Sequence, residues 1–157
     1  MSDRPDTGDK APAFDMAADG GGRVALSDYA GQNLVLYFYP RDDTPGCTKE
    51  AIAFTEMGND FAKAGTAIVG VSKDTVAKHD KFKAKHDLGV ALGSDEDGSV
   101  CEAYGVWVEK KTYGRTYMGI ERSTFLIDAK GKVSQVWRKV RVNGHVEAVN
   151  EAAAALS

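Results

Sequence analysis

Two long apolar runs stand out along the chain, at residues 33–39 (NLVLYFY) and 66–72 (TAIVGVS). Continuous apolar runs of this length, without alternating polar positions, are typical of strands buried on both faces of an α/β sheet. Pro40 ends the first run, because proline has no N–H with which to continue a ladder of strand hydrogen bonds. The first run therefore predicts the central strand of the sheet.

Helical spacing follows each of these strands. After Pro45, one face of a predicted helix collects residues three or four apart in the chain, namely Cys47, Ala51, Phe54, Gly58 and Phe61. A polar helix is expected at about residues 75–86, and a short strand near residues 90–92. The order strand, helix, strand, helix, strand indicates the α/β class.

The flanking segments complete this picture. Residues 14–27, interrupted by glycines at 20–22, predict a small N-terminal β-hairpin, and residues 123–127 and 133–137 predict two strands joined by a turn. Short helices are expected at about residues 99–104 and 146–156, and an irregular stretch at 105–118. We predict a single α/β domain over residues 1–157, with a central mixed sheet and helices on both faces.

Composition narrows the possible partners and location. The chain has 157 residues, with 20 basic and 23 acidic side chains and a net charge of −3, so no electrostatic footprint for nucleic acid or an anionic membrane is present. The N-terminal segment has no apolar signal region, and no run has the length of a membrane span, which favours a cytoplasmic protein. Two cysteines are too few for a secreted disulfide scaffold, so both are expected as thiols.

Cys47 is the strongest candidate for chemistry. It falls in the first turn of the predicted helix, where unpaired backbone N–H groups and the helix dipole favour a thiolate. Pro45 suits the first helical position, and Gly46 leaves room for a small reactant near the backbone. The hydroxyl of Thr44 is close enough in sequence to face the sulfur. An inert, buried cysteine is the alternative interpretation.

The residues around Cys47 also resemble a known family. Pro40, Thr44 and Cys47 form the pattern P-x-x-x-T-x-x-C, which resembles the active-site motif of peroxiredoxins. The wider segment YFYPRDDTPGCTKEA is similar to the peroxiredoxin Q subfamily, also called bacterioferritin comigratory proteins. Further similar stretches, such as GSDEDGSVCEAYGVW and TYMGIERSTFLIDAKGKV, extend the resemblance over nearly the whole chain.

The resemblance implies a thioredoxin-like fold and the reduction of hydrogen peroxide and organic hydroperoxides, without a metal or any other cofactor. By position, Cys47 resembles the attacking thiolate, and Thr44 the hydroxyl that positions the peroxide. Pro40 resembles the residue that shields the thiolate from water. Arg122 matches an arginine that would keep the thiolate charged and donate hydrogen bonds to the peroxide oxygens.

Attack on a peroxide would leave a sulfenic acid on Cys47, which must be reduced. In the subfamily, a resolving cysteine often lies five residues further on or in the next long helix, but this chain has Ile52 at the first place and no cysteine near residues 82–83. Cys101 is expected to be a helix cysteine facing the core, and an unusual resolving cysteine is the alternative. A one-cysteine cycle follows, with thioredoxin, glutaredoxin or glutathione as external reductant, and the resemblance favours a monomer.

Other thiol enzymes fit the sequence less well. A thioredoxin-like thiol–disulfide oxidoreductase usually needs C-x-x-C, but the third residue after Cys47 is Glu50. A cysteine phosphatase would need an arginine six residues after the cysteine, where the chain has Ala53. A redox sensor would use the same thiolate and stays an open alternative.

The remaining histidines and aromatic residues are interpreted as structural. His79 and His86 have no carboxylate or thiolate at ligand spacing in the sequence, so we expect surface or core-edge residues and no metal site. The aromatic residues between positions 104 and 117 are expected to pack, or else to edge the substrate entrance: Tyr104, Trp107, Tyr113 and Tyr117.

Overall fold

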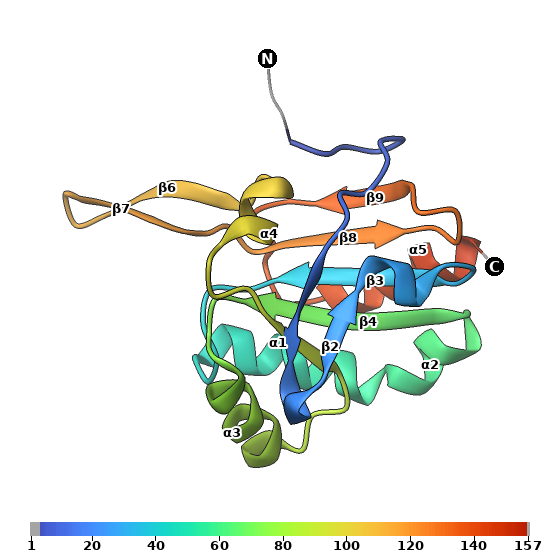
Figure 1. Cartoon of the computed structure of the whole chain (residues 1–157), viewed down its shortest axis with the longest axis horizontal. Helices are drawn as coiled ribbons and strands as arrows, with labels where there is room; N and C mark the ends of the chain where they lie inside the picture. The colour runs from blue at the N-terminus through green and yellow to red at the C-terminus, as the bar shows by residue number, and fades with distance from the viewer. Residues whose placement is uncertain (1–3, 157) are drawn as a thin grey trace.

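The computed structural model describes residues 4–156 as a seven-stranded mixed sheet, a separate two-stranded sheet and flanking helices (Figure 1). The strands are β1 (Asp15–Ala18), β2 (Arg23–Ala25), β3 (Asn33–Phe38), β4 (Thr66–Ser72), β5 (Ala91–Ser94), β6 (Trp107–Thr112), β7 (Arg115–Ile120), β8 (Ser123–Ile127) and β9 (Val133–Trp137). The helices are α1 (Pro45–Glu56), α2 (Gly58–Lys63), α3 (Val76–His86), α4 (Ser99–Ala103) and α5 (His145–Leu156), with short 3-10 turns η1 (Asp19–Gly21) and η2 (Leu26–Tyr29). None of the helices in this part of the chain is long and apolar enough to cross a bilayer.

The large sheet has the strand order β2-β1-β5-β4-β3-β8-β9. β3 pairs in parallel with β4 and β4 with β5, whereas β8, β9, β1 and β2 join through antiparallel pairs. β3 is an interior strand between β4 and β8, but the middle strand of the seven is β4, so the expectation that residues 33–39 form the central strand is off by one position. The N-terminal hairpin of β1 and β2 is confirmed, and the central mixed sheet agrees with the predicted α/β architecture.

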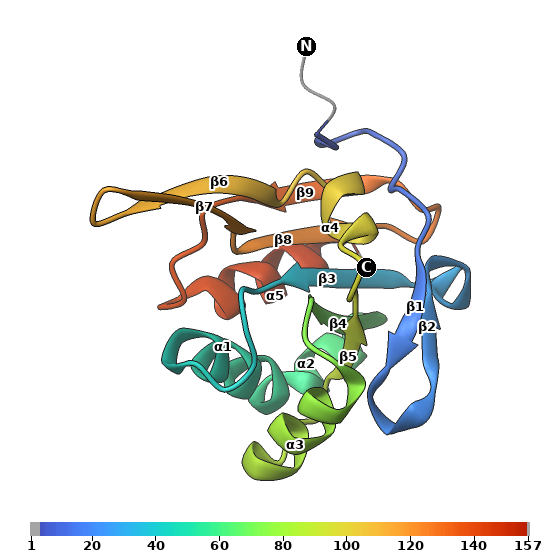
Figure 2. The ribbon, with the colours of Figure 1, turned by 60° about the vertical axis from the view of Figure 1, so that its left-hand side comes forward.

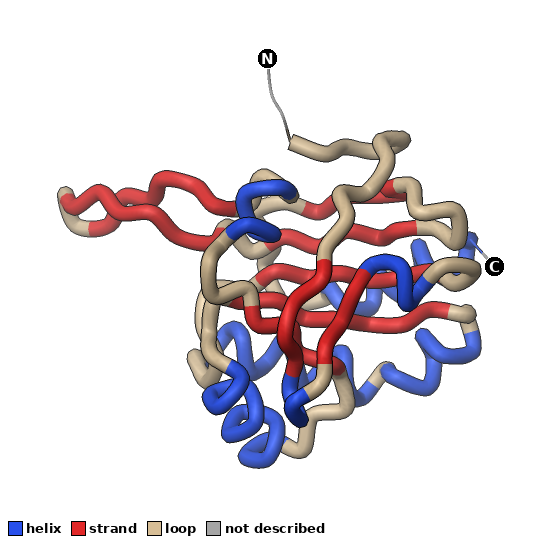
Figure 3. Tube along the Cα trace, in the orientation of Figure 1, coloured by secondary structure: helices blue, strands red, loops and turns tan. Residues whose placement is uncertain are grey.

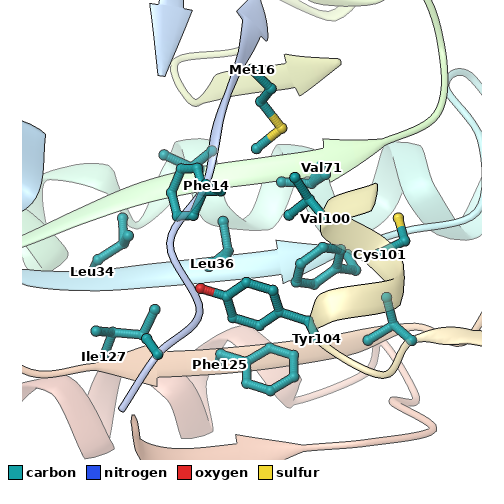
Figure 4. Packing of buried hydrophobic residues seen from close by; sticks show 14 of the residues in the cluster. Phe14, Met16, Leu34, Leu36, Val71, Val100, Cys101, Tyr104, Phe125 and Ile127 are labelled. Carbon is teal, nitrogen blue, oxygen red and sulfur yellow. The ribbon is translucent and has the colours of Figure 1, made fainter. Parts of the chain in front are cut away.

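Successive side chains of β3 point into two different cores. Leu34, Leu36 and Phe38 pack with α4 and the segment before β1 (Figure 4). Val35 and Tyr37 pack on the opposite face, against buried residues of α1, α2, α3 and α5. Figure 2 shows how these helices are arranged around the sheet. Helices therefore cover both faces of the sheet, and α1 lies on the face opposite to α4.

The contact between α1 and the sheet depends on one glycine. The ring of Tyr37 in β3 stacks on Phe54 of α1, with ring centroids 4.5 Å apart. A Cβ atom on Gly70 of β4 would lie 2.6 Å from Cζ of Tyr37, so the missing side chain makes room for the ring. The Tyr37 hydroxyl is buried and has no hydrogen-bond partner among residues 4–156. Gly70 thus allows Tyr37 to support the helix that carries Cys47.

Two expectations about secondary structure are wrong. The predicted irregular stretch at residues 105–118 instead forms the antiparallel hairpin of β6 and β7, which projects from the body as a red arm in Figure 3. Both of its faces are largely exposed, so the apolar alternation that identifies a half-buried strand is missing. The long helix after Pro45 is also broken at Met57 (φ −92°, ψ 9°) into α1 and α2.

The aromatic residues of this region separate into two groups. Tyr104 is fully buried, packs on Phe38 and Phe125, and donates a hydrogen bond to the Pro12 carbonyl oxygen (2.6 Å), which confirms a packing role. Tyr113 is 100% exposed, so the expectation that it packs within the chain is wrong.

Candidate active site

Cys47 lies in the first turn of α1, directly after the loop that follows β3. Thr44 precedes the helix in an extended conformation (φ −94°, ψ 155°), and Pro45 occupies the first helical position. The backbone N–H of Thr48 donates to the Thr44 carbonyl (2.8 Å), so the N–H groups of Gly46 and Cys47 have no carbonyl one turn earlier within the helix. This end of the helix favours a negative charge on the Cys47 sulfur.

A guanidinium group lies against that sulfur. Nη2 of Arg122 donates to Sγ of Cys47 at 3.3 Å, and Nη1 donates to Oε1 of Glu50 at 2.6 Å. A Cβ atom on Gly46 would lie 3.1 Å from Nη2 of Arg122. The space beside Gly46, which we expected to hold a small reactant, is therefore filled by the arginine side chain. The structure therefore brings the predicted residues Cys47 and Arg122 together, although 75 positions separate them in the chain.

Glu50 is a site residue that the sequence analysis missed. Its side chain is fully buried three residues after Cys47, which places both on the same face of α1. Burial raises the pKa of Glu50 to about 7, while the adjacent Arg122 opposes this shift. Its second oxygen, Oε2, has no hydrogen-bond partner in the described part of the chain. The spacing from Cys47 was the signal that could have identified it.

Arg122 stays charged in this environment. Burial favours loss of its proton, but the charges of Glu50 and Cys47 outweigh burial and raise the pKa of Arg122 above its ordinary value. Its backbone is fixed as well, because its carbonyl accepts a hydrogen bond from the N–H of Val140 (3.0 Å). A permanent positive charge is thus held beside the sulfur.

His145 is a second residue that the sequence analysis missed. It is buried at the start of α5, with Nε2 2.8 Å from Oγ1 of Thr124. Burial and the nearby charge of Arg122 lower the pKa of His145 to about 4. This imidazole is therefore neutral at neutral pH and adds no second positive charge to the site.

The loop before Cys47, residues 40–44, is fastened to α3 through Asp42. One oxygen of this carboxylate accepts a hydrogen bond from the Tyr39 hydroxyl (2.5 Å), and the other lies 2.6 Å from Nδ1 of His79. Nε2 of His79 lies 2.9 Å from the Gly93 carbonyl oxygen, and it must donate there because a carbonyl only accepts. The expectation that His79 is a surface or core-edge residue is wrong, since the ring is completely buried against a carboxylate.

Asp43 adds a second connection between this loop and α3. Its backbone has a positive φ of 61°, a conformation that aspartate tolerates better than most residues. Its carboxylate accepts hydrogen bonds from Nζ of Lys85 (2.8 Å) and lies 2.9 Å from Nε2 of His86. His86 is at the edge of the core, as expected, although it does have a carboxylate beside it. Helix α3 thus holds the loop that leads to Cys47.

Thr44 and Pro40 lie on the outer side of the site. The Thr44 hydroxyl donates to the Arg41 carbonyl oxygen (3.0 Å), and no hydrogen bond joins it to Cys47 within residues 4–156. Pro40 is exposed at the start of the loop. The hydroxyl proton of Thr44 is therefore directed to the Arg41 carbonyl oxygen rather than to the Cys47 sulfur.

Cys101 lies far from this arrangement in the fold. It is fully buried on α4, in the core that contains Leu36 (Figure 4). Cys47 packs in the other core, which contains Tyr37. The sheet therefore separates the two free thiols. Burial and a hydrogen bond to Asp95 raise the pKa of Cys101 far above its usual range, so this thiol stays protonated. Within the described residues, no group of three potential metal-ligating side chains comes together.

Comparisons with known proteins agree with this geometry. The AhpC/TSA family model matches residues 7–136 of the chain. Peroxiredoxin Bcp of Bacillus subtilis is 51% identical over 139 residues, which cover 88% of each protein. A structure of the Xanthomonas campestris bacterioferritin comigratory protein, studied for its alkyl peroxide reduction activity, is 46% identical with a TM-score of 0.87 and covers 90% of both chains. PrxQ of Xylella fastidiosa is 38% identical, with a TM-score of 0.92 over 97% of both chains.

Proposed function

This chain belongs to the peroxiredoxin Q branch of the AhpC/TSA family, and we propose that Cys47 is the residue that attacks the peroxide. Membership of this family makes the chain a thiol-dependent peroxidase. One observation carries the assignment of Cys47. The Cys47 sulfur lies at the N-terminal end of α1 and accepts a hydrogen bond from a charged guanidinium, Nη2 of Arg122, at 3.3 Å. Both features stabilise a thiolate, which is the nucleophilic form of cysteine.

The proposed reaction starts with attack of the Cys47 thiolate on one oxygen of a hydroperoxide. An S–O bond forms, the O–O bond breaks, and the departing oxygen takes up a proton from solvent and leaves as water or an alcohol. Negative charge shifts from sulfur to that oxygen during the step. The guanidinium of Arg122 donates hydrogen bonds where this charge develops, and Glu50 directs the guanidinium by accepting from Nη1.

Thr44 and Pro40 complete the proposed site. A hydroxyl oxygen can accept two hydrogen bonds while donating one. Thr44 can therefore accept a hydrogen bond from the O–H of a peroxide while it continues to donate one to the Arg41 carbonyl oxygen. We assign Pro40 to covering the sulfur from bulk water, since it begins the loop that leads into α1.

An external thiol completes the proposed cycle. Its sulfur attacks the Cys47 sulfenic acid, which releases water and leaves a mixed disulfide, and a second thiol then frees Cys47 as the reductant becomes a disulfide. The separation of Cys47 and Cys101 by the sheet supports this one-cysteine route. Thioredoxin, glutaredoxin and glutathione are the candidate reductants. We propose that the enzyme is a monomer and acts in the cytoplasm, where these thiols are present.

Intact-mass spectrometry of the reduced protein, before and after one equivalent of hydrogen peroxide, tests this proposal. We expect the gain of one oxygen, which peptide mapping assigns to Cys47. Cys47→Ser should gain none, whereas the matched control Cys101→Ala should behave like the wild type. Loss of two hydrogens with a peptide linking Cys47 to Cys101 would overturn the one-cysteine cycle. An unchanged mass in the wild type would overturn the role of Cys47.

A further inference from the structure

Only the base of the arm formed by β6 and β7 packs on the body, through Trp107 and Ile120, and residues 111–118 are exposed. The arm forms a sheet of its own rather than joining the seven-stranded sheet, and it extends away from the body in two views (Figures 1 and 2). A two-stranded hairpin alone has marginal stability in water, because neither of its faces is buried. Tyr113 is completely exposed at its tip, and Tyr117 and Met118 are 48% and 49% exposed.

The turn at the tip has an unusual residue. Tyr113 and Gly114 occupy its two central positions with φ values of 52° and 76°. Two central residues with positive φ form the type I′ turn, in which asparagine or aspartate followed by glycine is preferred and a bulky side chain is strained. The tyrosine ring obtains no contact in return, since it is fully exposed. A strained, exposed aromatic residue at a loop tip points to a role outside the chain itself.

One face of the arm is cationic and aromatic. The strand register places Lys110 opposite Tyr117 and Thr112 opposite Arg115, so these four side chains share a face. Lys110 extends across Gly119, where a Cβ atom would lie 3.2 Å from its Cδ. Neither Lys110 nor Arg115 forms an ion pair within residues 4–156. A hollow of about 350 Å³ lies among Thr112, Tyr113, Arg115 and Tyr117.

The charge of the arm is opposite to that of the remaining chain. Residues 107–120 contain three basic side chains and one acidic side chain, a formal charge of +2, while the whole chain has −3. The face defined above has no carboxylate. Tyrosine and arginine are also among the residue types that most often dominate binding energy at protein interfaces. This face therefore suits an acidic protein surface better than a second copy of its own positive arm.

The arm leads directly to the active site. β7 ends at Ile120, and two residues later Arg122 donates to the Cys47 sulfur. From Ile120 to Arg115 the arm extends about 17 Å, at roughly 3.4 Å per residue. A small thiol cannot touch the tip and Cys47 together over this length, but a protein of about 100 residues, with a radius of gyration near 13 Å, can.

We propose that the cationic face of the β6–β7 arm is the docking surface for the protein thiol that reduces Cys47, and that this partner has an acidic surface around its own cysteine. This inference rests on the proposed function, because it assumes a sulfenic acid on Cys47. The chemistry at Cys47 is the balanced exchange given above. The arm contributes affinity and orientation, while the thiol of the partner reaches the sulfur beside Arg122.

Charge reversal on the arm tests the proposal. In the double variant Lys110→Glu/Arg115→Glu, we expect kcat/KM for a bacterial thioredoxin, or for glutaredoxin with glutathione, to fall at least tenfold at low salt. Oxidation of Cys47 by hydrogen peroxide and turnover with dithiothreitol should stay unchanged. The matched control Lys63→Glu/Lys130→Glu makes the same charge change on exposed lysines near the start of β3 and the end of β8, which is the end of the sheet away from Cys47. This control should retain wild-type kcat/KM.

A second variant separates docking from folding. Tyr113→Asn introduces a residue that the turn prefers, so we expect equal or higher stability together with a weaker interaction with the protein reductant. Three results would overturn the proposal: an unchanged kcat/KM in the arm variants, an equal fall of kcat/KM in the control, and a wild-type protein that only small thiols reduce. If hydrogen peroxide does not oxidise Cys47 at all, the proposed function fails first, and the mass measurement shows this separately.

Discussion

Replacing Glu50 with glutamine should change how the stability of the protein depends on pH. Burial raises the pKa of Glu50 from 4.5 to about 7. The folded state therefore retains a proton that the unfolded chain has already lost, and the resulting stabilisation is fully present below pH 4.5 and lost as the pH rises through about 7. At about 1.4 kcal/mol per pH unit, this amounts to about 3 kcal/mol in the free energy of unfolding.

Urea denaturation at half-unit steps from pH 4.5 to 8 provides the measurement. Because glutamine does not titrate, the free energy of unfolding of Glu50→Gln minus that of the wild type should rise by about 3 kcal/mol over this range. Glu151→Gln on the exposed side of α5 is the matched control, and its difference from the wild type should vary by less than about 0.5 kcal/mol. A pH-independent difference for Glu50→Gln would refute the reasoning.

Three further variants test other parts of the structure. Arg122→Gln should slow oxidation of Cys47 by about 100-fold in stopped-flow assays with hydrogen peroxide, because a donor to the developing charge is lost; an unchanged rate would remove Arg122 from the site. Cys101→Ala should keep turnover with an external thiol within about twofold of the wild type, since its thiol is buried behind the sheet; loss of turnover would instead assign it a resolving role. For His79, burial alone would lower the pKa, but the hydrogen bond with Asp42 outweighs it and raises the pKa above 6.5. The stabilisation by the charged imidazole is thus complete below pH 6.5 and lost as the pH rises through the folded-state pKa of His79. Compared with the wild type, His79→Gln should therefore lose the most stability at acidic pH. A larger loss at alkaline pH in thermal denaturation would contradict this.

Local pattern was sufficient for the parts of the fold that bury apolar residues. β3 and β4 were predicted because each is a continuous apolar run flanked by turn or helix signals. β6 and β7 were missed because both faces are largely exposed, and residues such as Lys110 and Lys111 give the segment no regular spacing of apolar residues. The spacing of apolar residues along a sequence reflects which positions are buried, so it does not identify the strands of an exposed arm.

The active site divides in the same way. Cys47 could be placed at a helix start from its neighbours in the chain, because helix capping is local. The contact of Arg122 with the sulfur joins positions 75 residues apart, so only the family resemblance indicated it. The pairing of Asp42 with His79 depends on how α3 packs beside the loop, and no signal within either segment reveals that packing.

The fit of the Tyr37 ring over Gly70 limits the order in which mutations can accumulate during evolution. With tyrosine in place, even alanine at position 70 would put a Cβ atom 2.6 Å from the ring, so that change alone would force the ring to move. Shrinking position 37 first would open a cavity beneath Phe54 and loosen the helix that carries Cys47. The two positions are therefore coupled, and a change at one is expected to need a compensating change at the other.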